Sequence, residues 1–238
     1  MRATFGLFIA LVLLPSISPG QNSGLSKDWN ADVSVYVLAA GMSGNTTFHG
    51  IPADVDVPFS KIWDNLEATG MGRAAVGYRR WAISTDVIYM QLGATKNNVN
   101  VSFDQWVVQP VVEYKVTNWL SPYAGARYIR LNGSVQGPLG RNPSGTQEWW
   151  DPVIGADLRL PASSKFGLKL RADIGGFGAG STLSGQIEPL LDWRVKKRVF
   201  IQAGYRWFYS DYTTGSGLNQ FRYDVWTQGP EFGATFHF

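Results

Sequence analysis

The feature of this sequence that most constrains its fold is an alternation of apolar and polar residues with a period of two. Successive side chains of a β-strand point to opposite faces, so this alternation gives each strand one apolar and one polar face. The last residues show it clearly, with Phe232, Ala234, Phe236 and Phe238 on one face and Glu231, Gly233, Thr235 and His237 on the other. No stretch carries the i, i+3, i+4, i+7 spacing of a long helix. The sequence therefore predicts an all-β protein.

Turn residues divide the alternating stretches into ten predicted strands. They cover residues 30–43, 68–80, 81–94, 101–116, 119–132, 147–160, 165–178, 184–195, 198–212 and 222–238. Tight connections (79–80, 117–118, 161–164, 196–197) alternate with mostly longer ones (44–67, 95–100, 133–146, 179–183, 213–221). Short turns on one rim and longer loops on the other are typical of membrane barrels. If the first long loop contains a strand pair, at 46–48 and 55–57, we expect it to extend a hairpin above the membrane without adding barrel strands.

One face of the ten predicted strands is nearly free of ionisable residues. In residues 147–160, Ile154 and Leu158 alternate with Asp157 and Arg159, and exceptions such as Arg130 lie near strand ends, where a side chain can reach water. A soluble barrel alternates in the same way, so the period alone does not say which face is wet. The aromatic residues of the apolar face favour a membrane, because they gather at both strand ends, as Tyr and Trp do at lipid headgroups. They are Tyr78, Trp81, Tyr114 and Trp193 beside the short turns, and Trp106, Trp150, Trp207, Tyr209 and Trp226 beside the long loops.

We therefore expect a closed antiparallel transmembrane β-barrel of ten strands, with eight as the alternative, and a lumen lined by the charged face. The predicted lumen network contains Asp32, Asp86, Glu113, Asp157, Asp173, Glu188, Asp192 and Glu231 together with Arg73, Arg127, Arg159, Lys169, Arg171, Arg194 and Arg206. These charges nearly cancel, and Tyr36, Tyr123, Trp149 and Phe208 add bulk. Eight strands make a barrel that side chains just fill, so ten should be closed or nearly so. A structural network is favoured over a narrow or gated ion path.

The N-terminus reads as an export signal. Arg2 precedes an apolar run, residues 5–14, and a breaker region, residues 15–20, with small residues before Gln21. The run is shorter than the ~20 residues of a membrane-spanning helix. We expect a cleaved signal peptide, residues 1–20, and a barrel domain, residues 21–238. The chain contains no Cys, which argues against disulfides and a lipid anchor, and its formal charge of +3 gives no reason to expect nucleic-acid binding.

Several motifs resemble those of small Gram-negative outer-membrane β-barrel proteins, a large and mostly uncharacterised group. They are residues 54–66, 150–155, 171–181, 204–206 with 211–212, and 229–238. The C-terminal residues Phe232, Phe236 and Phe238 resemble the insertion signal of such proteins, which implies recognition by the barrel-assembly machinery. The resemblance implies residence in the cell outer membrane and contact with its lipid. It implies no activity, because barrels of this size host porins, adhesins, enzymes and structural proteins alike.

The first long loop contains a short helix signal. In residues 58–66, Phe59, Ile62, Trp63 and Leu66 fall on one stripe. Such a helix could fold over the barrel mouth, rest on the outer leaflet or dock a partner protein.

The sequence gives little support for catalysis or for metal binding. The only histidines are His49 and His237, no Ser is spaced for a triad, and Glu188 and Asp192 are expected to face Arg194 and Lys169. We expect no enzymatic activity, cofactor or metal. A structural envelope role is favoured. The alternatives are a narrow porin or ion channel, and a surface adhesion protein acting through loops 44–66 and 133–146. The oligomeric state stays open.

Overall fold

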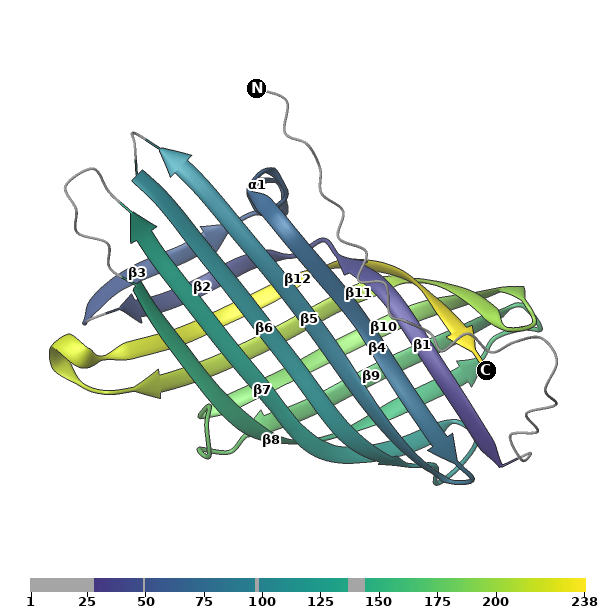
Figure 1. Cartoon of the computed structure of the whole chain (residues 1–238). Coiled ribbons are helices and arrows are strands. Elements are labelled where there is room, and N and C mark those ends of the chain that lie inside the picture. Colours follow the sequence, from purple (N-terminus) through teal and green to yellow (C-terminus); the bar gives the residue numbers. More distant parts are fainter. Residues whose placement is uncertain (1–27, 49, 97–98, 137–143) are drawn as a thin grey trace, which may run out of the picture.

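The computed structural model describes residues 28–48, 50–96, 99–136 and 144–238, and shows a single antiparallel barrel (Figure 1). The predicted signal peptide lies outside these residues, so its cleavage stays a prediction. The strands are β1 (Trp29–Leu38), β2 (Gly41–Phe48), β3 (Ile51–Val57), β4 (Leu66–Tyr78), β5 (Trp81–Lys96), β6 (Val99–Tyr114), β7 (Leu120–Gln136), β8 (Ser144–Pro161), β9 (Phe166–Gly176), β10 (Leu183–Lys196), β11 (Val199–Thr214) and β12 (Phe221–His237). Helix α1 (Phe59–Asp64) and a 3₁₀ turn, η1 (Gly217–Asn219), complete it.

The barrel is closed by the pairing of β1 with β12. Val33 lies opposite Phe236, and Val37 opposite Phe232. Along the other edge β1 pairs with β4, and each further strand pairs with the next in sequence as far as β12. Ten strands therefore form the wall, which confirms the prediction of ten and excludes the alternative of eight.

The first long loop contains the predicted hairpin. Strand β2 pairs with the outer part of β12, and β3 pairs with β2. Strand β2 continues the course of β1 after a break at residues 39–40, where the Ala39 N–H donates to the Pro230 carbonyl oxygen. After β2 the chain returns toward the opposite rim through β3, helix α1 and β4, in that order. The hairpin of β2 and β3 therefore extends the barrel wall beyond β1 and β4 and adds no strand to the ten.

The outer face of the barrel is apolar over one continuous belt. Its most exposed large side chains include Ile83, Val112, Ile154, Ile187 and Leu191, all on the parity that the sequence predicted to face outward. On β5 the belt runs from Trp81 to Tyr89, which at ~3.3 Å per residue and ~40° tilt is a height of about 20 Å. This height is close to the ~25 Å apolar band of outer-membrane barrels.

The upper limit of the belt is marked by a change to hydrogen-bonded polar side chains. The Tyr128 hydroxyl donates to Glu148, the Asn132 amide to Asp104, and the Tyr209 hydroxyl to Asp224. All six residues lie on the outer face, at or above the level of Trp106 and Trp150. The strands continue past this level, so part of the barrel stands above the hydrocarbon layer.

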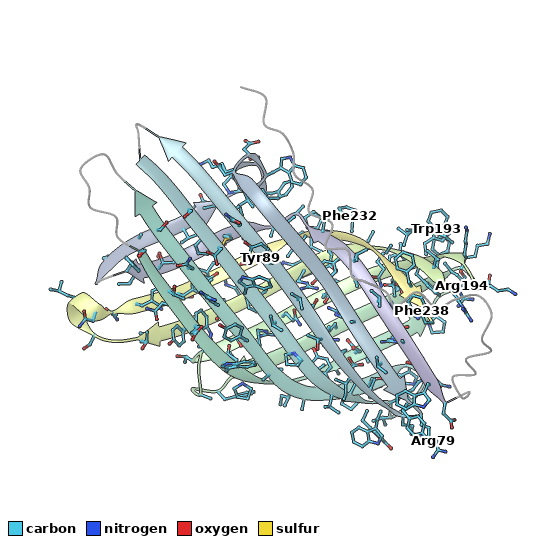
Figure 2. The ribbon with its side chains drawn as sticks, viewed as in Figure 1. Arg79, Tyr89, Trp193, Arg194, Phe232 and Phe238 are labelled. Carbon is cyan, nitrogen blue, oxygen red and sulfur yellow. The ribbon has the colours of Figure 1, made fainter. Side chains whose placement is uncertain are left out.

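The opposite rim carries the short turns and both ends of the described chain. Figure 2 shows Arg79, Trp193, Arg194 and Phe238 at this end of the barrel, with Tyr89 well away from it. The turn between β4 and β5 contains two residues, and Arg79 adopts a left-handed φ of 55° there. Its guanidinium pairs with Asp28. Short turns beside the chain ends identify this rim as the periplasmic one.

Helix α1 differs from its prediction in length and orientation. It covers Phe59–Asp64 only, and Leu66 begins β4. Ile62 points into the barrel and is 4% exposed, whereas Phe59 and Trp63 are exposed and lie 5.7 Å apart, measured between ring centroids. The predicted single apolar stripe is therefore wrong, because positions 59 and 63 share a face that position 62 does not.

Candidate functional site: a sealed lumen

The lumen is filled by side chains arranged in layers. Nearest the periplasm is a small polar vestibule, followed by ionic clusters, a group of amides and, at the outer mouth, an apolar plug. The layers follow from strand geometry, since every second residue of a strand points inward and the next inward residue lies one level higher. On β5, for example, Ser84, Asp86, Ile88 and Met90 pass from polar to apolar along one inward row.

Arg206 of β11 is the centre of the main ionic cluster. Its Nη1 lies 3.2 Å from Asp86 Oδ2, its Nη2 3.2 Å from Glu188 Oε2, and its Nε 3.0 Å from Glu231 Oε2. The guanidinium also lies over the ring of Tyr36, with its carbon 4.9 Å from the ring centroid. Arg206 is 1% exposed. These contacts join β5, β10, β11, β12 and β1 through one side chain.

Arg73 completes this cluster from β4. Its Nη2 lies 2.8 Å from Glu188 Oε2 and 3.1 Å from Asp86 Oδ2. The Tyr36 hydroxyl donates to the other oxygen of Asp86, at 2.5 Å. Since β4 and β5 lie across the lumen from β10 and β11, these ion pairs cross the channel axis and block it.

Two further arginines fill the lumen on either side of the main cluster. Arg171 pairs with Asp157 at 3.0 Å and with Glu113 at 3.6 Å, and its guanidinium carbon lies 4.2 Å from the centroid of the Tyr123 ring. On the outer side, Arg127 pairs with Asp173 and donates to Gln109 and Ser184. Arg73, Arg127, Arg171 and Arg206 therefore each meet a carboxylate.

The remaining predicted charges lie at the periplasmic rim. Lys169 pairs with Asp192 at 2.7 Å, and the Gln202 amide donates to the same carboxylate. Asp32 pairs with His237. Arg159 is exposed at the edge of the vestibule.

Arg194 is exposed over the ring of Phe200, just before a register shift in β10, and has no ion pair among the described residues. The expectation that Glu188 faces Arg194 is wrong, because Glu188 lies several residues deeper and contacts Arg73 and Arg206 instead.

Sequence reasoning missed several buried polar groups. Asp151 is fully buried, and its Oδ1 accepts a hydrogen bond from the Ser181 N–H. Gln109 and Gln186 bond to Asp173 and to each other. Their inward parity was a usable signal, but the count of charges ignored amides and omitted Asp151. With Asp151 buried and Arg159 and Arg194 exposed, the sealed part of the lumen holds more carboxylates than cations.

The outer mouth is closed by an apolar plug of ten buried residues. They are Met42, Ile62, Met90, Val107, Ile129, Leu131, Trp149, Phe208, Tyr223 and Val225. The rings of Trp149 and Tyr212 stack 4.1 Å apart, and the Trp149 indole N–H donates to Ser181 Oγ. Only Ile62 comes from α1, and it covers the lumen from the side of β4.

Two small cavities remain, one on each side of the main ionic cluster. The outer cavity has a volume of about 40 Å³ and lies below Ile62, with Asp86 and Arg206 at its base. The periplasmic vestibule has a volume of about 50 Å³ and is lined by Arg73 and Glu188, among others. A water needs ~10–15 Å³, so each cavity has room for a few waters. The ionic cluster separates them.

The predicted aromatic residues lie in pairs on the outer face. On the periplasmic side Trp81 contacts Tyr114, Trp29 contacts Tyr78, and Trp193 contacts Phe166. On the outer side the pairs are Tyr89 with Trp106, Tyr128 with Trp150, Tyr205 with Trp207, and Tyr209 with Trp226. The predicted insertion residues Phe232, Phe236 and Phe238 are exposed on the same face of β12 or at its end.

Reactive groups are sparse in the described chain. His237 contacts Asp32 at the periplasmic rim, and His49 lies outside the described residues. In the part of the chain that the structure describes, no group of three or more His, Cys, Asp or Glu side chains is arranged to hold a metal ion. Within the same residues, no helix is long and apolar enough to cross a membrane.

Comparison with solved structures finds outer-membrane proteins. The chain is similar to the outer membrane protease OmpT from Escherichia coli, at 10% identity and a TM-score of 0.50, over 89% of this chain and 97% of that one. It also matches Ail, the attachment invasion locus protein of Yersinia pestis (10% identity, TM-score 0.43, 90% of this chain and 100% of that one). A FadL homologue from Pseudomonas aeruginosa matches at 9% identity and a TM-score of 0.39, over 88% and 90% of the two chains.

No model of a protein family matches this sequence, and no curated protein matches it either. At these low identities the likeness to OmpT concerns the fold alone. The closed ten-strand barrel, its apolar belt and this likeness together show that the chain has the fold of an outer-membrane β-barrel.

Proposed function

We propose that this barrel is a structural, non-conducting component of the outer membrane. The observation that carries the proposal is the ionic cluster centred on Arg206, which crosses the lumen between strands on opposite walls. An ion that passed would have to break several buried ion pairs and then displace the apolar plug. Removing one partner of a buried pair costs ~3–5 kcal/mol, so spontaneous opening is rare.

The composition of the lumen supports the same proposal. A selective pore needs a water-filled path lined by groups that bind its ion weakly. Here the charges are engaged with each other, and the space above them is occupied by Ile129, Phe208 and Val225. Ion pairs in a protein interior fill space and fix the geometry of the wall. We propose no catalytic role, because the central lumen carboxylates Asp86 and Glu188 are held in ion pairs with Arg73 and Arg206.

Planar-bilayer recording of the refolded mature protein tests this proposal. Insertion is verified in the same preparation by protection of the barrel from protease. We expect no discrete conductance steps. Regular steps whose ion preference changes in Arg73→Ala would instead establish a narrow porin.

Surface interaction is the second candidate, because the described strands continue beyond the outer aromatic level. Strands β7 and β8 pass Tyr128 and Trp150 and extend to Gln136 and Ser144, and β2 and β3 form a hairpin of their own. Residues 137–143, within the predicted loop 133–146, lie outside the described residues. Shortening the 44–66 and 133–146 loops should abolish binding to a cell or ligand, with the barrel still inserted, if this candidate is right.

A further inference from the structure

The barrel wall has a seam just above the membrane belt. Strand β3 pairs with β2 only, and β5 pairs with β4 no further than Leu66 opposite Leu92. Among the described residues no ladder joins β3 to β5. Every other neighbouring pair in the wall is joined by a ladder, so this is the one described place where the wall depends on a helix.

Helix α1 lies in this seam. At its start, Pro58 and Phe59 pack against Gly41 of β2, and at its end the Asn65 carbonyl oxygen accepts a hydrogen bond from the Gly93 N–H, at 2.9 Å. On β5, Tyr89 belongs to the outer aromatic pairs. Gln91 lies directly above Tyr89, and Gly93 is two residues beyond Gln91. The seam and its helix are therefore at the height of the lipid headgroups.

The helix is weakly held in this position. It has six residues, no side-chain N-cap and no acidic residue in its first turn. One side chain, Ile62, is buried, while Phe59 and Trp63 are exposed toward the outside. Isolated helices of this length are not stable by themselves, so Ile62 and the two end contacts hold it in place.

The outer cavity lies directly behind α1. Ile62 forms its roof, Leu38 and Ala40 one wall, and Met71 and Met90 another. Methionine side chains adapt readily to a changed volume. The base is polar, with the Gln109 and Gln186 amides beside Asp86 and Arg206. An apolar chamber with a few convergent polar groups at one end is the usual form of a small-molecule site.

The charged residues at the base of the outer cavity determine which kind of ligand the cavity can bind. The cluster below the cavity contains three carboxylates, Asp86, Glu188 and Glu231, and two guanidiniums, Arg73 and Arg206. Of these five groups only Asp86 and Arg206 line the cavity, and Arg206 is already enclosed by three carboxylates. An anionic head group at the base would therefore meet Asp86 and find no unpaired cation among the lining residues, whereas an uncharged head could donate a hydrogen bond to Asp86.

We propose that the cavity behind α1 binds uncharged, apolar molecules with a hydrogen-bond donor, which enter sideways from the outer leaflet when α1 swings out of the seam. The cavity of about 40 Å³ is too small for such a ligand while Ile62 is in place. Binding therefore requires displacement of Ile62, and the exposed ring pair of Phe59 and Trp63 gives the displaced helix an apolar face to rest on lipid.

Two dyes of one skeleton test this proposal. N-Phenyl-1-naphthylamine is uncharged and carries one N–H donor, and 8-anilinonaphthalene-1-sulfonate is the same molecule with a sulfonate. Their fluorescence is titrated with protein refolded into phospholipid nanodiscs, with empty nanodiscs as the background. We expect saturable binding of the uncharged dye, and binding of the sulfonate weaker by at least about tenfold, equivalent to ~1.4 kcal/mol. Equal binding of both dyes would overturn the assigned chemistry.

Variants locate the site. Ala40→Leu fills the cavity and should abolish saturable binding, whereas Ile62→Ala enlarges it and should tighten binding of the uncharged dye. Folding of each variant is checked by resistance to protease. If wild type and Ala40→Leu bind the uncharged dye equally, the dye is partitioning into lipid and the proposal fails.

A disulfide tests the movement of α1. The chain has no Cys, and a Cβ placed on Gly41 would lie 3.7 Å from the Pro58 Cα. The pair Gly41→Cys and Pro58→Cys should therefore fix the helix to β2 when oxidised. We expect the oxidised form to lose dye binding and the reduced form to regain it. Unchanged binding in the oxidised form would contradict entry through this seam. Conductance plays no part in these measurements, so their failure leaves the structural proposal intact.

Discussion

At the scale of single residues, the depth of a charge in the barrel decides its role. Arg206 is enclosed by three carboxylates, whereas Arg194, on the same predicted face, is exposed at the last regular pairing of β10 before its register shift. Sequence parity identifies the face correctly in both cases. It carries no information on depth, because it is a local property and depth depends on where the turns end the strands. For the same reason it could not place Arg159 outside the ion-pair network.

Replacing Arg206 should cost far more stability than replacing an exposed arginine. Arg206→Met leaves three buried carboxylates with only Arg73 to compensate them, and we expect a loss of ~3–5 kcal/mol in the free energy of unfolding. Urea unfolding of the protein refolded into vesicles, followed by Trp fluorescence, measures it. Arg222→Met, at an exposed ion pair above the belt, is the control and should change this free energy by no more than ~1 kcal/mol. Equal effects would contradict the network. Adding Glu188→Gln to Arg206→Met should recover part of the loss.

A charged side chain placed on the outer belt should destabilise the inserted protein, because this face contacts lipid. Ile154 lies midway between Leu158 and Trp150 on β8 and is exposed on the outer face. Ile154→Arg should destabilise the inserted protein by ~2–4 kcal/mol, the cost of Arg at the bilayer midplane. The matched control is Leu218→Arg in η1, where the side chain is 82% exposed and should tolerate the charge. Refolding yield into vesicles gives a first comparison, and tolerance of Arg at position 154 would argue against a lipid-facing belt.

At the scale of elements, the ten barrel strands were predictable and the insertion between β3 and β4 was only partly so. The alternation within each segment predicts the ten barrel strands. It does not decide whether the first long loop contains a strand pair, which the structure shows as β2 and β3. The direction of α1 does not follow from the sequence either, because one turn of helix offers too few residues to define a face. Ile62 enters the lumen only because the seam behind it is open. The partner of Asp151 could not be predicted either, because the Ser181 N–H that it accepts from belongs to a turn thirty residues away.

The β2–β3 hairpin should be dispensable for the barrel. Ser43 lies opposite Asp56, so a two-residue Asn-Gly turn can replace residues 44–55. We expect the shortened protein to refold with unchanged protease resistance of β4–β12, because closure depends on β1 with β12 and β4. Failure of the shortened chain to refold would show that the hairpin is part of the barrel core.

The C-terminal strand is expected to act in assembly as well as in closure. The Phe238 N–H donates to the Ala31 carbonyl oxygen at 2.9 Å, and the ring is exposed. Deleting Phe238 should lower the amount of folded protein in the outer membrane of cells, while refolding of the purified chain into vesicles stays close to that of wild type. Loss of both would point to a purely structural role for this residue, and loss of neither would remove the predicted insertion signal.

At the scale of the whole molecule, the protein is a cylinder with an apolar outer face and paired charges inside. Composition and alternation predicted this arrangement, and the pairing of β1 with β12 confirms closure. The sequence overestimated how evenly the lumen charges balance, since parity counted Arg159 and Arg194 as interior. Which charges meet across the lumen was also beyond prediction, because such pairs join residues as far apart as Asp86 and Arg206. The sealed interior favours a structural role, and the seam at α1 adds a route by which the outer leaflet can reach the mouth.

Accessibility of spin labels tests this arrangement most directly. Because the chain lacks Cys, a single Cys at position 83, 154 or 187 of the belt, or at 218 above it, carries one nitroxide. In protein refolded into bilayers, labels at the three belt positions should relax strongly with oxygen and weakly with a water-soluble nickel chelate, and the label at position 218 should show the reverse. Nickel-accessible labels at positions 83, 154 and 187 would mean that water covers this face, and would contradict the account.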